Sequence, residues 1–347
     1  MNGPGDPKAS TVAPPSVPIK RGSTFQMRFV AIWIAMLGLI VFSAIVAPRS
    51  LLPSTVLAVI PFAAFLAITA IGEALVIISR GIDLSIPAII TLSSTIILGF
   101  SRGHDVAVVT ALAAALFFAT AIGFINGLLV AVLQLNALIV TLAVGAITTG
   151  ATLWYRESLP QESRVPPGMA EWGDARFLGF NISVWVTTAL IVVLTVVLRK
   201  TTVGRRFLAV GANPRAAWIV GINAVVYQIA AFTVAGFLYG VAGILLSAFI
   251  RNPTLRVGEP YLLAPIAAAV LGGTAVTGGI GSLVAVTGAA LFLTQLGQVL
   301  QMLGLSSAIQ FVIEGIAIAT GMAVVRVNWA QLMWIVSSWR GGKAQKS

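Results

Sequence analysis

The chain has 347 residues, of which 58% are hydrophobic and only 9% are charged. Soluble domains carry roughly 25% charged residues, so this composition excludes a soluble fold and indicates a membrane protein. The net charge of +11 is no evidence for nucleic-acid binding, because excess Lys and Arg in a membrane protein mark its cytoplasmic side. The chain has no cysteine, which excludes disulfides and thiolate-bound metal.

Residues 1–27 are rich in Pro, Gly, Ser and Thr, and we interpret them as a disordered cytoplasmic tail. A transmembrane domain over 28–326 and a cytoplasmic C-terminal tail over 327–347 follow. Two runs, 106–155 and 260–313, contain no Asp, Glu, Lys or Arg. Because one span needs about 20 apolar residues, each run must hold at least two spans joined by tight turns.

The hydropathy pattern predicts an all-α polytopic protein with about ten transmembrane helices in the lipid bilayer. Strict alternation of apolar and polar residues is absent, and the segments are too long for barrel strands. The third and eighth spans are short, which predicts re-entrant or broken helices. The expected spans are 28–47, 55–79, 84–101, 106–133, 137–154, 182–199, 227–250, 261–276, 281–299 and 309–326.

Ten spans with the N-terminus inside place 14 of the 21 basic residues on the cytoplasmic side. This asymmetry predicts that both termini are cytoplasmic. The second to fifth spans and the seventh to tenth spans form two groups of four. Each group carries a Gly-containing break: Gly81-Ile82-Asp83 in the first, and Gly272-Gly273 with Gly278-Gly279 in the second. Paired breaks are typical of transporters with an internal repeat.

Small residues also recur in 145–150 and 235–243, where we expect close helix packing. The denser run of glycines in 272–281 predicts instead a loop or helix break with exposed backbone groups.

The loop of about 199–226 is the most informative segment between spans. Its first part, 199–221, holds five basic residues and no acidic one, so a cytoplasmic partner protein could bind there. Asn213-Pro214 is a favourable helix start, and Ala216-Ala217 offers a small surface that fits a groove.

Acidic residues within or beside the spans are the remaining candidates for function. An ionised group in hydrocarbon is costly, so Glu73, Asp83 and Glu314 should face the bundle interior or water. For Glu73 and Glu314, a structural role and a polar pathway both stay open. Asp83 suits a helix N-cap, with a substrate ligand as the alternative, and Arg80 three residues earlier is a candidate ion-pair partner. Asn126 is a further polar candidate.

Enzyme signatures are absent from the sequence. There is no phosphate-binding G-x-x-x-x-G-K-[ST] loop, because Gly342-Lys343 is followed by Ala344. Any ATP-driven work therefore requires a separate ATPase chain, which would hold the ATP and Mg²⁺; we expect no cofactor in this chain.

Four segments in order resemble those of the ribose/simple-sugar ABC importer permeases. They are IGEALVIISRGIDLSIPAIITLSS (71–94), NGLLVAVLQLNALIVTLAVGAITTGATLWY (126–155), GRRFLAVGANPRAAWIVGIN (204–223) and LGGTAVTGGIGSLVAVTGAALF (271–292). The resemblance implies a permease that works with a cytoplasmic ABC ATPase, an extracytoplasmic (periplasmic) solute-binding protein and a second permease copy or paralogue. It also implies an ATPase-coupling segment formed by Gly204, Arg205, Gly211, Asn213, Pro214, Ala216, Ala217 and Gly221.

The chain departs from the family pattern at several positions. Arg80 stands where a Gly commonly precedes GIDLS, and Ile86-Pro87 replace the usual Val-Gly after it. The expected function is import of a monosaccharide or similar small polar solute. The alternatives are a related permease for branched-chain amino acids or nucleosides, a proton- or sodium-driven transporter using Glu73 or Glu314, and a membrane-embedded enzyme.

Overall fold

A computed structural model of the chain describes residues 23–160, 163–306, 308–310, 312–313, 315–316 and 319. Most of the two expected tails, most of the tenth span and the candidate Glu314 lie outside these residues. The elements are α1 (Ser23–Val46), η1 (Pro48–Leu51), α2 (Pro53–Ile78), α3 (Ile86–Ser101), η2 (Asp105–Ala107), α4 (Val108–Ala131), α5 (Ala137–Glu157), α6 (Pro167–Asp174), β1 (Arg176–Phe177), β2 (Phe180–Asn181), α7 (Ile182–Lys200), α8 (Thr202–Ala212), α9 (Pro214–Ile219), α10 (Ala224–Ile250), η3 (Glu259–Tyr261), α11 (Ala264–Leu271) and α12 (Leu283–Met302).

Within the described ranges, 7 helices are long and apolar enough to cross a membrane: α1, α2, α4, α5, α7, α10 and α12. The all-α polytopic prediction is thereby confirmed. The third and eighth expected spans correspond to shorter apolar helices, Ile86–Ser101 and Glu259–Leu271. The 16 residues of α3 rise only about 24 Å, which is less than the roughly 30 Å of hydrocarbon in a bilayer.

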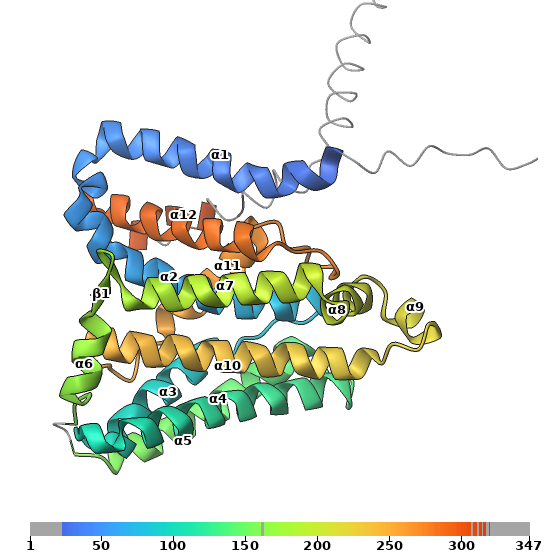
Figure 1. The fold of residues 1–347 in the computed structure, drawn as a ribbon, viewed down its shortest axis with the longest axis horizontal. Coiled ribbons are helices and arrows are strands. Elements are labelled where there is room, and N and C mark those ends of the chain that lie inside the picture. Colours follow the sequence, from blue (N-terminus) through green and yellow to red (C-terminus); the bar gives the residue numbers. More distant parts are fainter. Residues whose placement is uncertain are drawn as a thin grey trace, which may run out of the picture.

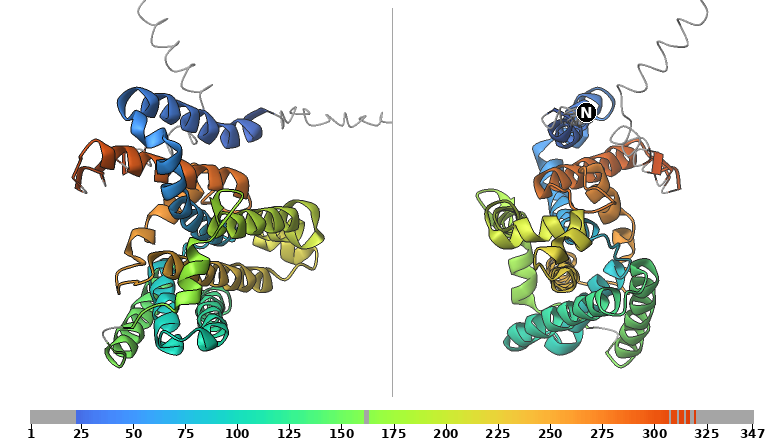
Figure 2. Two further views of the ribbon diagram at one scale, coloured as in Figure 1. Left: turned by 60° about the vertical axis from the view of Figure 1, so that its left-hand side comes forward. Right: turned by 90° about the vertical axis from the view of Figure 1, so that its right-hand side faces the viewer.

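Helices α2 and α10 form the centre of the bundle. In their most apolar windows 61% and 67% of residues are buried, against 17% in α1 and 11% in α7. Helix α1 packs on α12 at the side of the bundle (Figures 1 and 2). The apolar outer faces of α1 and α7 are therefore available to lipid.

Glycines allow α4 and α10 to lie in close contact. A Cβ on Gly123 would stand 2.3 Å from the Phe232 carbonyl oxygen, and one on Gly236 would stand 2.5 Å from that of Ala119. Close packing at small residues is what stabilises helix pairs in lipid, where the hydrophobic drive between helices is missing. The packing expected for 235–243 is confirmed. In 145–150, Gly145 packs on Ser85, whereas nothing lies within 4 Å of a Cβ on Gly150.

The two expected helix breaks contact each other. The first is the segment 79–85 between α2 and α3, and the second is the loop 272–282 between α11 and α12. The Gly279 backbone N–H donates a hydrogen bond of 2.9 Å to the Ile78 carbonyl, so the second loop completes the end of α2. Gly278 and Gly279 both have positive φ, at 87° and 75°, which glycine adopts without steric cost.

The remaining short elements lie at the two ends of the bundle (Figure 1). Helix α8 follows the end of α7, and α9 extends past the ends of both α7 and α10, at the end of the bundle where α1 also begins. Helix α6 and the β1–β2 hairpin lie at the other end. The hairpin pairs Arg176 with Asn181 and Phe177 with Phe180. An ion pair between Asp174 and Arg251 joins α6 to the end of α10.

Candidate functional site

The segment that resembles the coupling loop folds into two short helices. Helix α8 begins after Thr201, whose Oγ1 accepts a hydrogen bond of 3.2 Å from the Gly204 backbone N–H. A Cβ on Gly204 would stand 2.3 Å from the Leu198 and Val197 carbonyl oxygens. A residue without a side chain is therefore needed for the tight turn by which α8 leaves α7.

The joint between α8 and α9 is formed by Asn213 and Pro214. The Asn213 Oδ1 accepts a hydrogen bond of 3.1 Å from the Ala216 backbone N–H, and Pro214 occupies the first turn of α9. An Asn cap followed by Pro is a strong helix start, because the cap satisfies a free N–H and Pro has none to satisfy. The helix start predicted from the sequence is confirmed.

Helix α9 ends in a glycine turn. Gly221 has a φ of 79°, and the Ile222 backbone N–H donates a hydrogen bond of 2.9 Å to the Ala217 carbonyl. This closure is typical of a helix C-terminus at which glycine takes the left-handed conformation. Both ends of α9 are thus fixed by local interactions.

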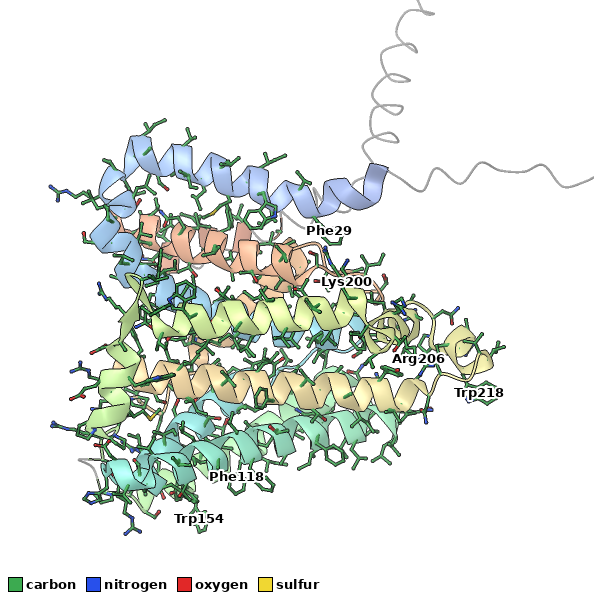
Figure 3. All side chains as sticks on the ribbon, in the orientation of Figure 1. Phe29, Phe118, Trp154, Lys200, Arg206 and Trp218 are labelled. Atoms are coloured by element: carbon green, nitrogen blue, oxygen red, sulfur yellow. The ribbon has the colours of Figure 1, made fainter. Side chains whose placement is uncertain are left out.

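Helix α9 exposes a large apolar surface at its C-terminal end. The exposed fractions are 75% for Trp218, 78% for Ile219 and 72% for Val220. Figure 3 shows Trp218 at the far tip of the molecule, well beyond the ends of the long helices. We call these three residues the α9 tip. These residues were not predicted from the sequence, although a Trp-Ile-Val run after a basic segment between spans is a usable signal.

The eight residues named for coupling separate into two groups. Gly204, Gly211 and Ala217 are buried within this chain, so their contacts are internal. Pro214 is half-buried. The exposed members are Arg205, Asn213, Ala216 and Gly221. The exposed members, together with the α9 tip, form the surface that another protein can reach.

Basic residues surround this surface. Arg199, Lys200, Arg205, Arg206 and Arg215 all belong to the end of α7, to α8 or to α9. Both ion pairs found in the described part of the chain, Arg251–Asp174 and Arg256–Glu259, involve other residues. The α8–α9 region is therefore a positively charged surface with an apolar tip.

A second group of candidates lies deep in the bundle. Glu73 in α2 and Asp83 in the segment 79–85 are both completely buried. The Asp83 backbone N–H lies 3.3 Å from both carboxyl oxygens of Glu73, and the Tyr239 hydroxyl donates to Glu73 Oε2 at 3.2 Å. Glu73 therefore ties the non-helical segment 79–85 to α2 and α10.

The expected N-cap role of Asp83 is wrong in its detail. Helix α3 begins at Ile86, and the residue at the N-cap position is Ser85. Asp83 lies two residues earlier, and its Oδ1 accepts hydrogen bonds from the Ser85 backbone N–H at 2.8 Å and from the Ser85 hydroxyl at 2.6 Å. Asp side chains favour this local turn, in which a carboxylate oxygen accepts a hydrogen bond from the backbone N–H two residues later.

The expected pairing of Arg80 with Asp83 is also wrong. The Arg80 Nε donates a hydrogen bond of 2.7 Å to the Gly211 carbonyl, and an Nη donates to the Ala212 carbonyl. The guanidinium thus points towards the C-terminus of α8, where free carbonyls favour a cation. Asp83, by contrast, is completely buried and is hydrogen-bonded to Ser85.

Asn126 and Thr141 complete this polar cluster from α4 and α5. The Asn126 Nδ2 donates to the Ser85 hydroxyl at 2.9 Å, and the Leu84 backbone N–H donates to Thr141 Oγ1 at 2.9 Å. Two buried oxygens, Asp83 Oδ2 and Asn126 Oδ1, have no hydrogen-bond partner in the structure. The cluster joins the first helix break to four helices, which is a structural role that two acids and an amide can fulfil.

Comparison with known proteins fits this geometry. Residues 55–319 match the family described as "Branched-chain amino acid transport system / permease component". The chain belongs to this permease family. The resemblance to ribose/simple-sugar importer permeases is confirmed. The ribose import permease protein RbsC of Bacillus subtilis (strain 168) is 33% identical over 83% of this chain and 89% of its own length.

Two further relatives have comparable identity. The ribose import permease protein RbsC of Escherichia coli (strain K12) is 32% identical over 84% of this chain and 91% of its own length. The autoinducer 2 import system permease protein LsrC of Salmonella paratyphi B (strain ATCC BAA-1250 / SPB7) is 32% identical over 78% of each chain. No solved structure matches the chain. The protein is a multi-pass membrane permease.

Proposed function

We propose that the chain is the permease subunit of an ATP-driven importer that carries a monosaccharide or similar polar solute across a bacterial inner membrane. The α9 tip carries this proposal. Three neighbouring apolar side chains, each more than 70% exposed, lie at the end of a short, well-capped helix outside the membrane-spanning bundle. Exposed apolar surface of this kind marks a site of protein–protein contact, because apolar side chains are unfavourable in water until a partner covers them.

The partner proposed for the α9 tip is a cytoplasmic ATPase of the ATP-binding-cassette class. An α9 of six residues fits a groove, with Trp218 as the anchor and the basic residues of α8 at the rim. Aromatic anchors contribute most to affinity, whereas rim charges mainly steer association. ATP and Mg²⁺ are placed on this partner, and the energy of closing two ATPase subunits reaches the membrane helices through α9 and α8.

Both termini are proposed to be cytoplasmic. Helix α1 begins at the same end of the bundle as α8 and α9, which supports this orientation for the N-terminus (Figure 1). Seven long helices, the short helices α3 and α11, and one further span over 309–326 add up to the ten spans expected. A second permease copy or paralogue and an extracytoplasmic solute-binding protein complete the proposed importer.

The relatives support a sugar-like solute. Two of the proteins compared are named for ribose import and one for autoinducer 2 import. The family description favours a second candidate, a branched-chain amino acid. A panel of radiolabelled D-ribose, other monosaccharides, adenosine and leucine, offered to the cognate binding protein, separates these classes.

Uptake by reconstituted vesicles tests the function itself. The permease is incorporated with and without its ATPase, the binding protein is added outside, and uptake of D-ribose and of the best solute from the panel is measured. We expect uptake only with the ATPase and ATP. Uptake undiminished by omission of the ATPase would overturn the proposal and favour ion coupling.

A further inference from the structure

Arg80 occupies a backbone conformation that its side chain disfavours. Its φ is 72°, in the left-handed region that glycine adopts freely and other residues adopt at a steric cost. This chain carries arginine where the permeases that it resembles commonly have glycine, so the steric cost of the position is offset by an interaction that the arginine side chain makes. The hydrogen bonds of the Arg80 guanidinium to the Gly211 and Ala212 carbonyls are that interaction.

Three backbone segments meet around this side chain. A Cβ on Gly211 would stand 2.1 Å from the Ile78 carbonyl oxygen, and one on Gly279 would stand 2.5 Å from the Ala212 Cα. A Cβ on Gly278 would stand 2.5 Å from the Arg80 Cγ, so the arginine stem lies over that glycine. The end of α2, the end of α8 and the loop 272–282 are thus in direct backbone contact.

The two sides of Arg80 lead to different parts of the molecule. On one side, Ala212 precedes Asn213, the cap at which α9 begins. On the other side, Arg80 is followed by Gly81 and Ile82, and then by Asp83 with its hydrogen bonds to Glu73 and Ser85. The guanidinium is therefore the side chain that bonds the end of α8 to the start of the non-helical segment leading into α3.

We propose that Arg80 is a positioning residue for energy coupling, which transmits movement of α8–α9 to the segment 79–85 and to the start of α3. This inference rests on the proposed docking of α9 to an ATPase. When the ATPase pulls on α9, the C-terminus of α8 moves with it. Because Arg80 holds two carbonyls of that terminus, the segment 79–85 follows, and the polar cluster around Asp83 is displaced relative to α2.

Arg80→Gly separates the contribution of the side chain from that of the backbone conformation. Glycine accepts a φ of 72° without strain, so the substitution removes the two hydrogen bonds while favouring the same backbone path. Arg102→Gly is the matched control. Arg102 also has a positive φ, 45°, but it ends α3 at the opposite side of the bundle from α8. Arg80→Lys, which keeps the charge and loses the planar fork, is the second variant.

Hydrogen exchange of the full permease–ATPase complex in nanodiscs provides a readout that needs no solute. Exchange of the peptides covering 79–85 and 213–221 is compared with and without a non-hydrolysable ATP analogue. In the wild type and in Arg102→Gly, we expect ATPase binding to protect 213–221 and the nucleotide to change exchange in 79–85 at least threefold. In Arg80→Gly, we expect protection of 213–221 to remain and the response of 79–85 to disappear.

Transport with ATP hydrolysis gives the second readout, using the solute that the wild type takes up, with radiolabelled D-ribose tried first. For Arg80→Gly we expect hydrolysis within about twofold of the wild type and at least a tenfold fall in solute carried per ATP. Arg80→Lys should fall between the two. A merely structural role for Arg80 would lower both rates together and leave their ratio unchanged.

The outcomes separate the two proposals. No protection of 213–221 in the wild-type complex would refute docking at α9, and the inference on Arg80 with it. Protection of 213–221 combined with a normal response of 79–85 in Arg80→Gly would overturn the role of Arg80 alone. If Arg80→Gly does not assemble, Arg80→Lys carries the same comparison, and failure of both to assemble would show a structural role and also overturn the inference.

Discussion

Glu73 and Trp218 each lie in an environment that their side chains disfavour, because a carboxyl group favours water and an indole favours burial. The carboxyl of Glu73 is 0% exposed inside the bundle, whereas the indole of Trp218 is 75% exposed outside it. The buried acid is hydrogen-bonded to Asp83 and Tyr239, while the exposed indole belongs to the α9 tip. The polar cluster draws its hydrogen bonds from this one chain, whereas the α9 tip is where we propose that a second protein binds.

The junction between these two regions gives the largest expected effect. In Gly211→Val, the new Cβ would stand 2.1 Å from the Ile78 carbonyl oxygen and 2.7 Å from the Gly279 backbone N, so two backbones would have to move. We expect a loss of about 3 kcal/mol or more, at the upper end for overpacked sites. The measurement is the apparent unfolding temperature in detergent, together with the monodisperse fraction after purification.

Gly150→Val is the control for that substitution. Nothing lies within 4 Å of a Cβ on Gly150, although it also belongs to a helix. We expect its unfolding temperature to stay within about two degrees of the wild type, because an exposed helical Gly→Val exchange changes little beyond propensity. Equal damage from the two substitutions would mean that the junction is not tightly packed.

The α9 tip gives the next largest effect. Trp218→Ala should weaken binding of the ATPase by about 30-fold, which corresponds to about 2 kcal/mol for loss of an aromatic anchor. Folding should be unaffected, because the side chain makes little contact within its own chain. Titration of the ATPase against permease in nanodiscs measures this, with Trp154→Ala as the control.

Trp154 is a close match for Trp218. Its exposed fraction is 78%, and Figure 3 shows it at the far side of the bundle from α9. The same substitution there removes an equally exposed indole without touching the proposed docking surface. Unequal effects of the two substitutions support docking at α9, and equal affinities would remove the basis for it.

Local sequence chemistry was sufficient to predict the start of α9, but not α8. An Asn-Pro helix start acts through neighbours in the chain, so Asn213 and Pro214 were identifiable without a structure, whereas Gly221 was named only through the family resemblance. The exposure of Trp218 was not identifiable, because an indole in a hydrophobic chain is equally compatible with a buried helix face. Only the position of α9 beyond α7 and α10 decides between these environments.

Interactions between distant residues were the part that the sequence could not provide. Arg80 and Asp83 are close in the chain with opposite charges, which favours an ion pair when only local spacing is known. In the structure α8 supplies carbonyls to Arg80 from residues 211 and 212, and Asp83 turns to Ser85. Likewise, the acids within the spans were predicted to face the interior, but no pattern indicated that Tyr239 would meet Glu73.

Asp83 gives a smaller effect that separates its charge from its hydrogen bonds. In Asp83→Ala, the Ser85 backbone N–H and hydroxyl lose their acceptor in a fully buried site, which should cost about 1–3 kcal/mol of unfolding free energy. Asp83→Asn keeps the accepting oxygen and places an amide where the unpartnered Oδ2 lies. We expect its unfolding temperature to equal that of the wild type. An Asn variant as unstable as the Ala variant would show that the charge itself is required.

The smallest effect is expected for Glu73→Gln, and it bears most directly on ion coupling. The Gln amide oxygen can still accept hydrogen bonds from the Asp83 backbone N–H and the Tyr239 hydroxyl, so the cluster keeps its geometry without a group that can ionise.

If ATP drives transport, uptake should stay within about threefold of the wild type at every proton gradient. A proton- or sodium-driven transporter that used Glu73 would instead lose uptake, because an amide can neither exchange a proton with the two sides of the membrane nor supply a negative charge to a sodium ion. Initial uptake rates in vesicles with and without an imposed proton or sodium gradient distinguish ATP coupling from ion coupling. A loss confined to gradient-driven uptake would mean that this acid, rather than the α9 tip, is where the protein receives its energy.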